Sequence, residues 1–449
     1  MSDGYISTAL TGKPVPMAHP APLVRSLPAI KVDSEQKWVT VILLAAVAYQ
    51  ALLCFLNTSG LRTSVAIVGL TEALIMLACL PLLMRRLLPG LIMIALLAGT
   101  YFCIAALVSG WLNPKTFRDL AIPLVFFWFG CNLGQPAMID RALVPIIFVV
   151  IALGLFELFM LDTYTRFFDI FSYYVSTGNL APITDFVRES KLQLNGVRPE
   201  GIGRTLLPGL LGNHRVSSVF LEPVSLGNFA TIVAAWGFSR DREDWRKGLL
   251  FVGSAIVMIV LCDSRFALLL MPLMFATRIL LRGPWLNLAL LTPFVAIVCV
   301  ILIGVFSHHH GDDLVGRLTV SGRALLNFDT QMLFGLSIPP YFGDMGYAYL
   351  LAGFGLPLTL LLWFGLWLQP LPDERGRRFR ALASLYMALI LGVSGTSLFA
   401  FKTAALLWCM LGCMSRNPAP RSLGLNQKSR PLLNALSHQH SQEEVNHVR

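Results

Sequence analysis

The segment 38–56, WVTVILLAAVAYQALLCFL, decides the class of this protein. It carries no charged residue, and as a helix rising 1.5 Å per residue it can cross a hydrocarbon core of about 30 Å. The whole chain of 449 residues has the same character, since 55% of it is hydrophobic and only 13% is charged. Soluble domains carry roughly a quarter charged residues. The mean hydropathy of +0.67 therefore predicts a protein that crosses a membrane many times.

Apolar segments of similar length recur as far as residue 415. They predict an all-α polytopic integral membrane protein with about twelve transmembrane helices. We place these at 38–56, 64–84, 91–110, 120–134, 142–161, 218–238, 249–263, 266–281, 285–306, 346–368, 381–399 and 402–415. Two long loops, 162–217 and 307–345, divide the chain into helix groups 38–161, 218–306 and 346–415. The tails, 1–37 and 416–449, are polar and rich in Pro, Ser and Gln, so we expect both to be disordered.

The distribution of Lys and Arg predicts the orientation of these helices. Both tails and the short loops on their side of the membrane hold 22 of the 35 basic residues. Both termini are therefore expected in the cytoplasm, with the two long loops on the outer face. The net charge of +10 is explained by this bias and by contact with anionic lipids, which leaves no reason to expect a nucleic-acid partner. The eight cysteines all fall in or beside the predicted helices, so no disulfide framework is expected.

Few ionisable residues lie within the predicted helices, chiefly Glu72, Glu157 and Glu222. Ion-coupled transporters usually place such groups near the middle of the membrane. Basic residues are instead concentrated in the long loops. The sequence therefore favours a functional site at the outer membrane face.

The first long loop opens on TRFFDIFSYYV, whose aromatic residues recur at helical spacing and predict a helix lying along the interface or an aromatic belt. It ends in HRVSSVFLEPVSLGNFA, residues 214–230. If 218–238 is a helix, Arg215 lies near its start and Glu222 lies deeper on a similar face, ahead of Pro223. This pair could hold a phosphate and contact a hydroxyl, or it could be a structural ion pair at the interface.

The second long loop contains HHHGDDLVGRLTVSGR, residues 308–323. Adjacent histidines in a loop rarely converge on one metal ion, so we expect no metal site here. Arg317 and Arg323 are the more informative residues, because guanidinium groups donate in pairs to phosphate oxygens. Leu318, Ala324 and Leu325 could tether a short helix to the membrane. Contact with lipid headgroups is the alternative reading of the two arginines.

Three segments resemble the bacterial Wzy-type polysaccharide polymerases and the related O-antigen ligases. They are HRVSSVFLEPVSLGNFA, CDSRFALLL, and RLTVSGRALLNFD followed by FGDMGYAYLLAGFGLPLTLLL. The similarity covers residues 200–365, and the layout is most like xanthan-type exopolysaccharide polymerases, with a glycosyltransferase-C-like architecture. Ligases typically have a histidine before the helix that follows the second loop. This chain has Asp344 there, which favours a polymerase.

The resemblance implies an undecaprenyl-diphosphate-linked oligosaccharide as substrate, polymerised at the periplasmic face of the bacterial inner membrane. The departing diphosphate needs charge stabilisation, for which the candidates are Arg215, Arg265, Arg317 and Arg323, with Arg198 and Arg204 as secondary contacts. The attacking sugar hydroxyl needs a base, for which Glu222, Asp344 and His214 are the candidates.

No cofactor is expected, because the chain has neither a P-loop nor a dinucleotide fingerprint. The loop NTSGLRT carries no acidic residue, which favours metal-independent transfer. The resemblance implies membrane lipids, chain-length regulators and export proteins as partners. Three alternatives stay open: an O-antigen-type ligase, a transporter or flippase of lipid-linked sugars or polysaccharide, and a structural membrane scaffold.

Overall fold

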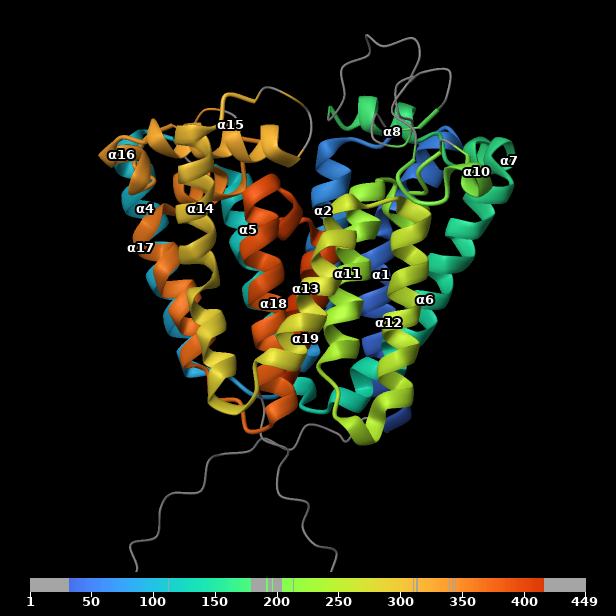
Figure 1. Cartoon of the computed structure of the whole chain (residues 1–449), viewed down its shortest axis with the longest axis horizontal. Coiled ribbons are helices and arrows are strands. Elements are labelled where there is room, and N and C mark those ends of the chain that lie inside the picture. Colours follow the sequence, from blue (N-terminus) through green and yellow to red (C-terminus); the bar gives the residue numbers. More distant parts are fainter. Residues whose placement is uncertain are drawn as a thin grey trace, which may run out of the picture.

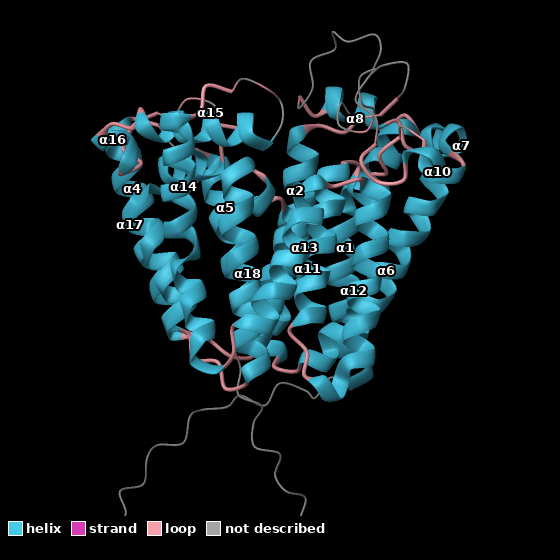
Figure 2. Ribbon diagram, in the orientation of Figure 1, coloured by secondary structure: helices cyan, strands magenta, loops and turns pink. Residues whose placement is uncertain are grey.

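The computed structural model describes residues 32–111, 113–178, 191–192, 196, 204–212, 214–309, 311, 314–338, 340, 342–343 and 345–415. These residues form helices and connecting loops, with no β-strand among them (Figure 2). Most helices run side by side as one bundle, and several short helices lie across one end of it (Figure 1). The all-α expectation is confirmed for the described residues.

The bundle is built from helices of 14 or more residues, together with short helices that extend two of them. In chain order they are α1 (Val32–Thr58), α2 (Val65–Ala78) with α3 (Leu80–Leu83), α4 (Pro89–Ser109), α5 (Pro114–Leu133), α6 (Pro136–Phe159), α11 (Pro223–Phe238), α12 (Trp245–Cys262), α13 (Arg265–Leu280), η3 (Gly283–Leu291) with α14 (Thr292–Phe306), α17 (Gly346–Leu368), α18 (Glu374–Val393) and α19 (Phe401–Met414). Several begin with proline in the first turn, where the missing N–H costs nothing.

Seven of the described helices are long and apolar enough to cross a membrane. They are 34–58, 65–83, 89–109, 136–159, 242–262, 283–306 and 346–368, and α11 and α19 are shorter apolar helices. A multi-pass membrane protein is therefore the class that the fold defines. Every range predicted from hydropathy coincides with a helix of the bundle, although the boundaries shift by several residues.

The two long loops lie at the same end of the bundle, which we call the loop end. There Figure 1 shows α7 (Leu161–Phe167), α8 (Ile170–Ser176) and α10 (Pro208–Leu211) from the first loop, and α15 (Leu314–Leu326) and α16 (Thr330–Leu333) from the second. The aromatic stretch predicted as one interfacial helix is two, because Asp169 accepts a hydrogen bond from the Ser172 N–H and starts α8 anew.

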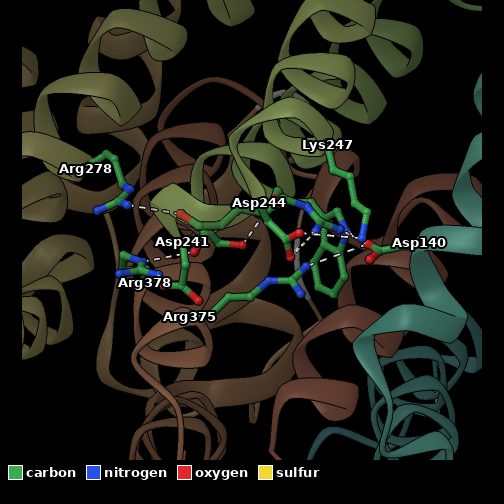
Figure 3. Close-up of polar contacts among 10 residues, drawn as sticks. Asp140, Asp241, Asp244, Lys247, Arg278, Arg375 and Arg378 are labelled. Carbon is green, nitrogen blue, oxygen red and sulfur yellow. Dashed lines mark hydrogen bonds and ion pairs between the residues drawn. The ribbon is translucent and has the colours of Figure 1, made fainter.

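The opposite end, which we call the basic end, is fastened by interlocking ion pairs (Figure 3). Asp140 at the start of α6 pairs with Arg240 and lies 3.7 Å from Arg375 on α18. Arg378, one turn further along α18, pairs with Asp241 and donates to the Ser239 carbonyl at 2.9 Å. These contacts join α6, the α11–α12 turn and α18, so charged residues from three separate parts of the chain gather at one end.

Glycine allows two pairs of helices to approach closely. A Cβ atom added at Gly130 of α5 would lie 2.0 Å from the Cys409 carbonyl of α19, and one at Gly412 would lie 2.0 Å from the Phe127 carbonyl. Gly304 of α14 and Gly322 of α15 make a similar contact, which seats α15 across the end of α14. Small residues at such crossings are typical of membrane helices, where packing drives association.

We expect Gly130→Ala to destabilise the protein, because the new methyl group meets backbone that must shift to admit it. Overpacking of this kind costs about 1–3 kcal/mol. Size-exclusion chromatography after heating in detergent should show a lower apparent melting temperature. Gly99→Ala on α4 is the matched control, since a Cβ there meets nothing within 4 Å. Equal melting temperatures for the two variants would contradict this account of the α5–α19 contact.

Candidate functional site

The segment 214–222 descends into the bundle from the loop end without forming a helix. The Ser218 hydroxyl donates to the Val150 carbonyl of α6 at 2.6 Å, nine residues before α6 ends. At 1.5 Å per residue this is about 13 Å below the end of α6. The Tyr164 hydroxyl donates to the Ser218 carbonyl at 2.9 Å and helps to hold the segment down.

The prediction that Arg215 and Glu222 share one helix face is wrong. Helix α11 begins only at Pro223, and the residues before it include a 3₁₀ turn, η1 (Ser218–Phe220), and Leu221 at φ 59°. Proline at the first helical position explains the late start, because its ring fixes φ and it has no N–H to donate. The Arg215 and Glu222 side chains consequently contact different partners.

His214 rests on a buried carboxylate. Its Nε2 lies 2.9 Å from Glu157 Oε1 on α6, and the Glu157 side chain is fully buried. The same carboxylate accepts the backbone N–H groups of Ser217 and Ser218. A carboxylate that orients an imidazole is the arrangement of a general base and its positioning residue. Glu157 was noted in the sequence only as an ionisable residue within a helix.

Two of the predicted arginines, Arg215 and Arg265, lie at the turn between α12 and α13, and a third, Arg204, lies nearby. Arg215 Nε donates to the Cys262 carbonyl at 3.1 Å. Arg265 opens α13 and is exposed, with Nε donating to the Thr205 hydroxyl at 3.0 Å. Asp263 accepts the Thr205 and Leu206 N–H groups and so ties the first loop to this turn. Arg215 and Arg265 therefore both lie at this turn, and Arg215 directly follows His214 in the chain.

Arg204 has a different environment from the other arginines of this group. It is 4% exposed, and its guanidinium donates to the carbonyls of His214, Val260 and Leu261. These bonds join the first loop to the end of α12. These contacts indicate a structural role for Arg204. Its contact with substrate stays a prediction.

Arg317 and Arg323 lie on α15 and are half-buried. Arg323 donates to the Ser307 carbonyl at 2.9 Å, and the Thr319 hydroxyl donates to the Ser307 hydroxyl at the same distance. The short helix predicted in this loop is present as α15, and its contact with the membrane stays a prediction.

The α15 arginines and the α13 turn both border α18, at neighbouring positions. Phe266 packs on Tyr386 with ring centroids 6.4 Å apart, and Leu318 lies against Gly392. Tyr386 and Gly392 are six residues apart, which is about 9 Å along a helix. No described contact joins the two arginine groups directly.

Some predicted residues lie outside the described part of the chain. They are Asp344, Arg198, His310, Asp312 and Asp313. Their proposed roles, and the expectation of no metal in the second loop, stay predictions.

Glu222 is ion-paired with Lys402, the second residue of α19, at 3.1 Å. The Glu222 carboxylate also accepts from the Ser225 hydroxyl at 2.8 Å. The Lys402 ammonium further donates to Gln50 Oε1 and to the Phe220 carbonyl, each at 2.8 Å. All three ammonium hydrogens thus have acceptors, and Lys402 is only 3% exposed.

This pair belongs to a longer line of buried polar contacts, which we call the polar chain: Ser225, Glu222, Lys402, Gln50, Tyr49, Glu72, Arg118, Asp119 and Tyr349. From Gln50 it passes to the Tyr49 hydroxyl at 3.2 Å, and Tyr49 donates to Glu72 at 2.5 Å. Arg118 Nε lies 3.5 Å from Glu72 and 3.2 Å from Asp119. The polar chain therefore links α19, α1, α2 and α5, and the Tyr349 hydroxyl extends it to α17.

Arg118 is the one residue of this group with donors to spare. Its side chain is 35% exposed, and its terminal nitrogens contact no acceptor among the described residues. Sequence reasoning missed Arg118, Asp119 and Lys402 because they fall at the ends of predicted spans, where charge is ordinary. The sequence feature that could have identified them is Glu72, which lies within an apolar segment, because a carboxylate buried in a membrane helix usually has a cationic partner.

Comparison of the chain with models of protein families, with curated proteins and with solved structures finds no match.

Removing the ammonium of Lys402 should destabilise the bundle, because the Glu222 carboxylate would keep its partly buried charge without its counter-ion. We expect Lys402→Met to cost about 1–3 kcal/mol, observed as a lower apparent melting temperature in detergent. The double variant Lys402→Met/Glu222→Gln should recover most of the loss. If the double variant is as unstable as the single one, the pair does not act as a unit.

Proposed function

We propose that this protein is a bacterial polymerase that joins undecaprenyl-diphosphate-linked oligosaccharide units into an exopolysaccharide by glycosyl transfer. The observation that carries the proposal is the meeting of His214, Glu157, Arg215 and Arg265 at the loop end. A cation group beside an oriented imidazole suits a reaction in which a diphosphate departs and a hydroxyl is deprotonated.

In the proposed reaction, the sugar hydroxyl of the acceptor attacks the anomeric carbon of the donor glycan. The new glycosidic bond forms as the bond from that carbon to the diphosphate breaks, and undecaprenyl diphosphate leaves with the bonding electron pair. Arg215 and Arg265 neutralise the developing charge, with Arg317 and Arg323 contributing from α15. The hydroxyl proton passes to a base.

His214 is the leading candidate for this base, since Glu157 fixes the orientation of its ring. Glu222 is engaged by the Lys402 ammonium and the Ser225 hydroxyl, and a carboxylate so stabilised accepts a proton less readily. Asp344 stays an alternative from the second loop.

The proposal includes twelve membrane crossings in the bacterial inner membrane, both termini in the cytoplasm and the loop end in the periplasm. It is supported by the gathering of the loop basic residues at the basic end, which matches the side that the positive-inside rule assigns to the cytoplasm. It includes neither a metal ion nor a cofactor.

A second candidate function is transport of the lipid-linked unit, and the polar chain favours it. Charged groups buried between membrane helices are typical of transport pathways. An O-antigen-type ligase would use the same loop-end geometry with a different acceptor.

Purified protein in liposomes, supplied with a lipid-diphosphate repeat unit, tests the proposal directly. Wild-type protein should form polymer with or without a chelator. Arg265→Lys should lower the rate about 10²-fold, because an ammonium cannot replace paired guanidinium donors to a diphosphate. Arg246→Lys is the control, since Arg246 is exposed at the basic end and, within the described part of the chain, its guanidinium lies over the Trp245 ring without an ion pair.

The same assay separates the candidates. A transporter would move the repeat unit across the bilayer without lengthening it. A ligase would transfer the glycan to a different acceptor and would not join repeat units to one another. Unchanged polymerisation by Arg265→Lys would contradict the assigned role of the arginines.

A further inference from the structure

The first two turns of α5 carry a pair of basic residues at the loop end, where this helix begins (Figure 1). Lys115 and Arg118 are three residues apart, so their side chains lie next to each other on one helix face. Both are open to solvent at least in part, and neither has a role in the proposed reaction. Arg118 also belongs to the polar chain, which connects this surface to the interior of the bundle.

Arg118 is held along one edge of its guanidinium. Its Nε faces the buried carboxylates of Glu72 and Asp119, at 3.5 and 3.2 Å. Each carboxylate is fixed in turn by a tyrosine hydroxyl that donates to it at 2.5 Å, Tyr49 to Glu72 and Tyr349 to Asp119. The two terminal nitrogens have no acceptor among the described residues, and both are open to solvent. They therefore form a pair of donors whose orientation is set by the protein.

Lys115 places a further donor beside this pair. Its ammonium lies 5.0 Å from the centre of the Tyr349 ring, a cation–π contact that limits where the side chain points. Lys115 is exposed, and it has no carboxylate partner in the described part of the chain. Donors that are oriented before a ligand arrives lose less entropy on binding, so this surface suits a ligand with several acceptor oxygens.

The balance of charge at this surface argues against a phosphate as that ligand. Lys115 and Arg118 carry two positive charges, and Glu72 and Asp119, which contact Arg118, carry two negative ones. An anion at the Arg118 terminal nitrogens would be repelled by both carboxylates from only slightly farther away than the cation attracts it, so little net attraction remains. A neutral ligand is not repelled, and its hydroxyl oxygens can accept from the same donors.

We propose that Lys115 and Arg118 form a subsite for the glycan of the lipid-linked unit, in which neighbouring hydroxyl oxygens of a sugar accept from the Arg118 terminal nitrogens and the Lys115 ammonium. The inference rests on the proposed function, which brings a glycan to the loop end. It assigns the two parts of the substrate to separate places. The diphosphate meets the arginines of the α12–α13 turn and of α15, and the sugar meets α5.

The subsite is tested by binding, with purified full-length protein in detergent and two probes. One probe is the oligosaccharide that mild acid releases from the lipid-linked repeat unit, and the other is undecaprenyl diphosphate without sugar. Saturation-transfer NMR measures the weak sugar complex, and native mass spectrometry measures the lipid complex. Wild-type protein should bind both probes.

Arg118→Lys keeps a positive charge between Glu72 and Asp119, so the variant should fold, but it loses the paired terminal nitrogens. We expect its affinity for the oligosaccharide to fall about tenfold, the lower end of what a hydrogen bond to a charged group contributes. Its affinity for undecaprenyl diphosphate should not change. Lys115→Gln removes the ammonium at an exposed position, where folding is not at risk, and should weaken oligosaccharide binding about threefold.

Arg62→Lys is the matched control, because Arg62 is exposed in the α1–α2 loop at the same end of the bundle and has no ion pair within the described residues. This variant should bind both probes as wild-type protein does. Arg265→Lys should show the reverse pattern, with weaker binding of undecaprenyl diphosphate and unchanged binding of the oligosaccharide.

Unchanged oligosaccharide binding by Arg118→Lys or by Lys115→Gln would overturn the subsite, as would wild-type protein that does not bind the oligosaccharide. Weaker binding of undecaprenyl diphosphate by these two variants would also overturn it, since it would indicate an anion site. The proposed function fails separately. Wild-type protein that binds the oligosaccharide through Arg118 but joins no lipid-linked units in liposomes would contradict the polymerase and leave the subsite in place.

Discussion

The carboxylate of Glu157 is the group on which the arrangement of the loop end depends. A chain that enters a helical bundle without forming a helix must find partners for its own N–H groups, because lipid and apolar side chains offer none. Glu157 accepts two such N–H groups, from Ser217 and Ser218, and contacts the His214 ring as well. The same carboxylate therefore holds the descending segment and orients the imidazole above it.

The charges inside the bundle are matched with one another. The Lys402 ammonium has three acceptors. Arg118 lies between the Glu72 and Asp119 carboxylates, and each of these carboxylates accepts a hydrogen bond from a tyrosine hydroxyl. Burying a charge without a partner is far more costly than burying a matched pair, so each of these residues requires the others. Among the described residues of the polar chain, Arg118 keeps terminal nitrogens without a hydrogen-bond acceptor, and its side chain is 35% exposed. The polar chain is therefore a second polar region, separate from the arginines of the α12–α13 turn.

The sequence predicted the helices well because their physical cause is local. An apolar run must be helical in lipid whatever its neighbours do, since the helix satisfies its own backbone. The positions of Arg215 and Arg265 beside each other could not be predicted in the same way, since they are brought together by Asp263 and by the carbonyls of a distant turn. The helix assumed from residue 218 was wrong because Pro223 and a buried carboxylate outweighed hydropathy. Lys402 and Asp119 were overlooked because they fall at the ends of predicted spans, and because Glu222 and Tyr349, which contact them, lie on other segments.

Composition and periodicity alone determined that this chain is a helical membrane protein with two long loops carrying arginine. They could do so because every backbone N–H and C=O group in lipid needs a hydrogen-bond partner, and a helix supplies these partners locally. Only the tertiary structure decided which loop residues contact the α12–α13 turn, which carboxylate meets His214, and which charges lie paired between helices. Those outcomes depend on contacts between segments far apart in sequence, where glycine crossings and buried ion pairs select one packing from many.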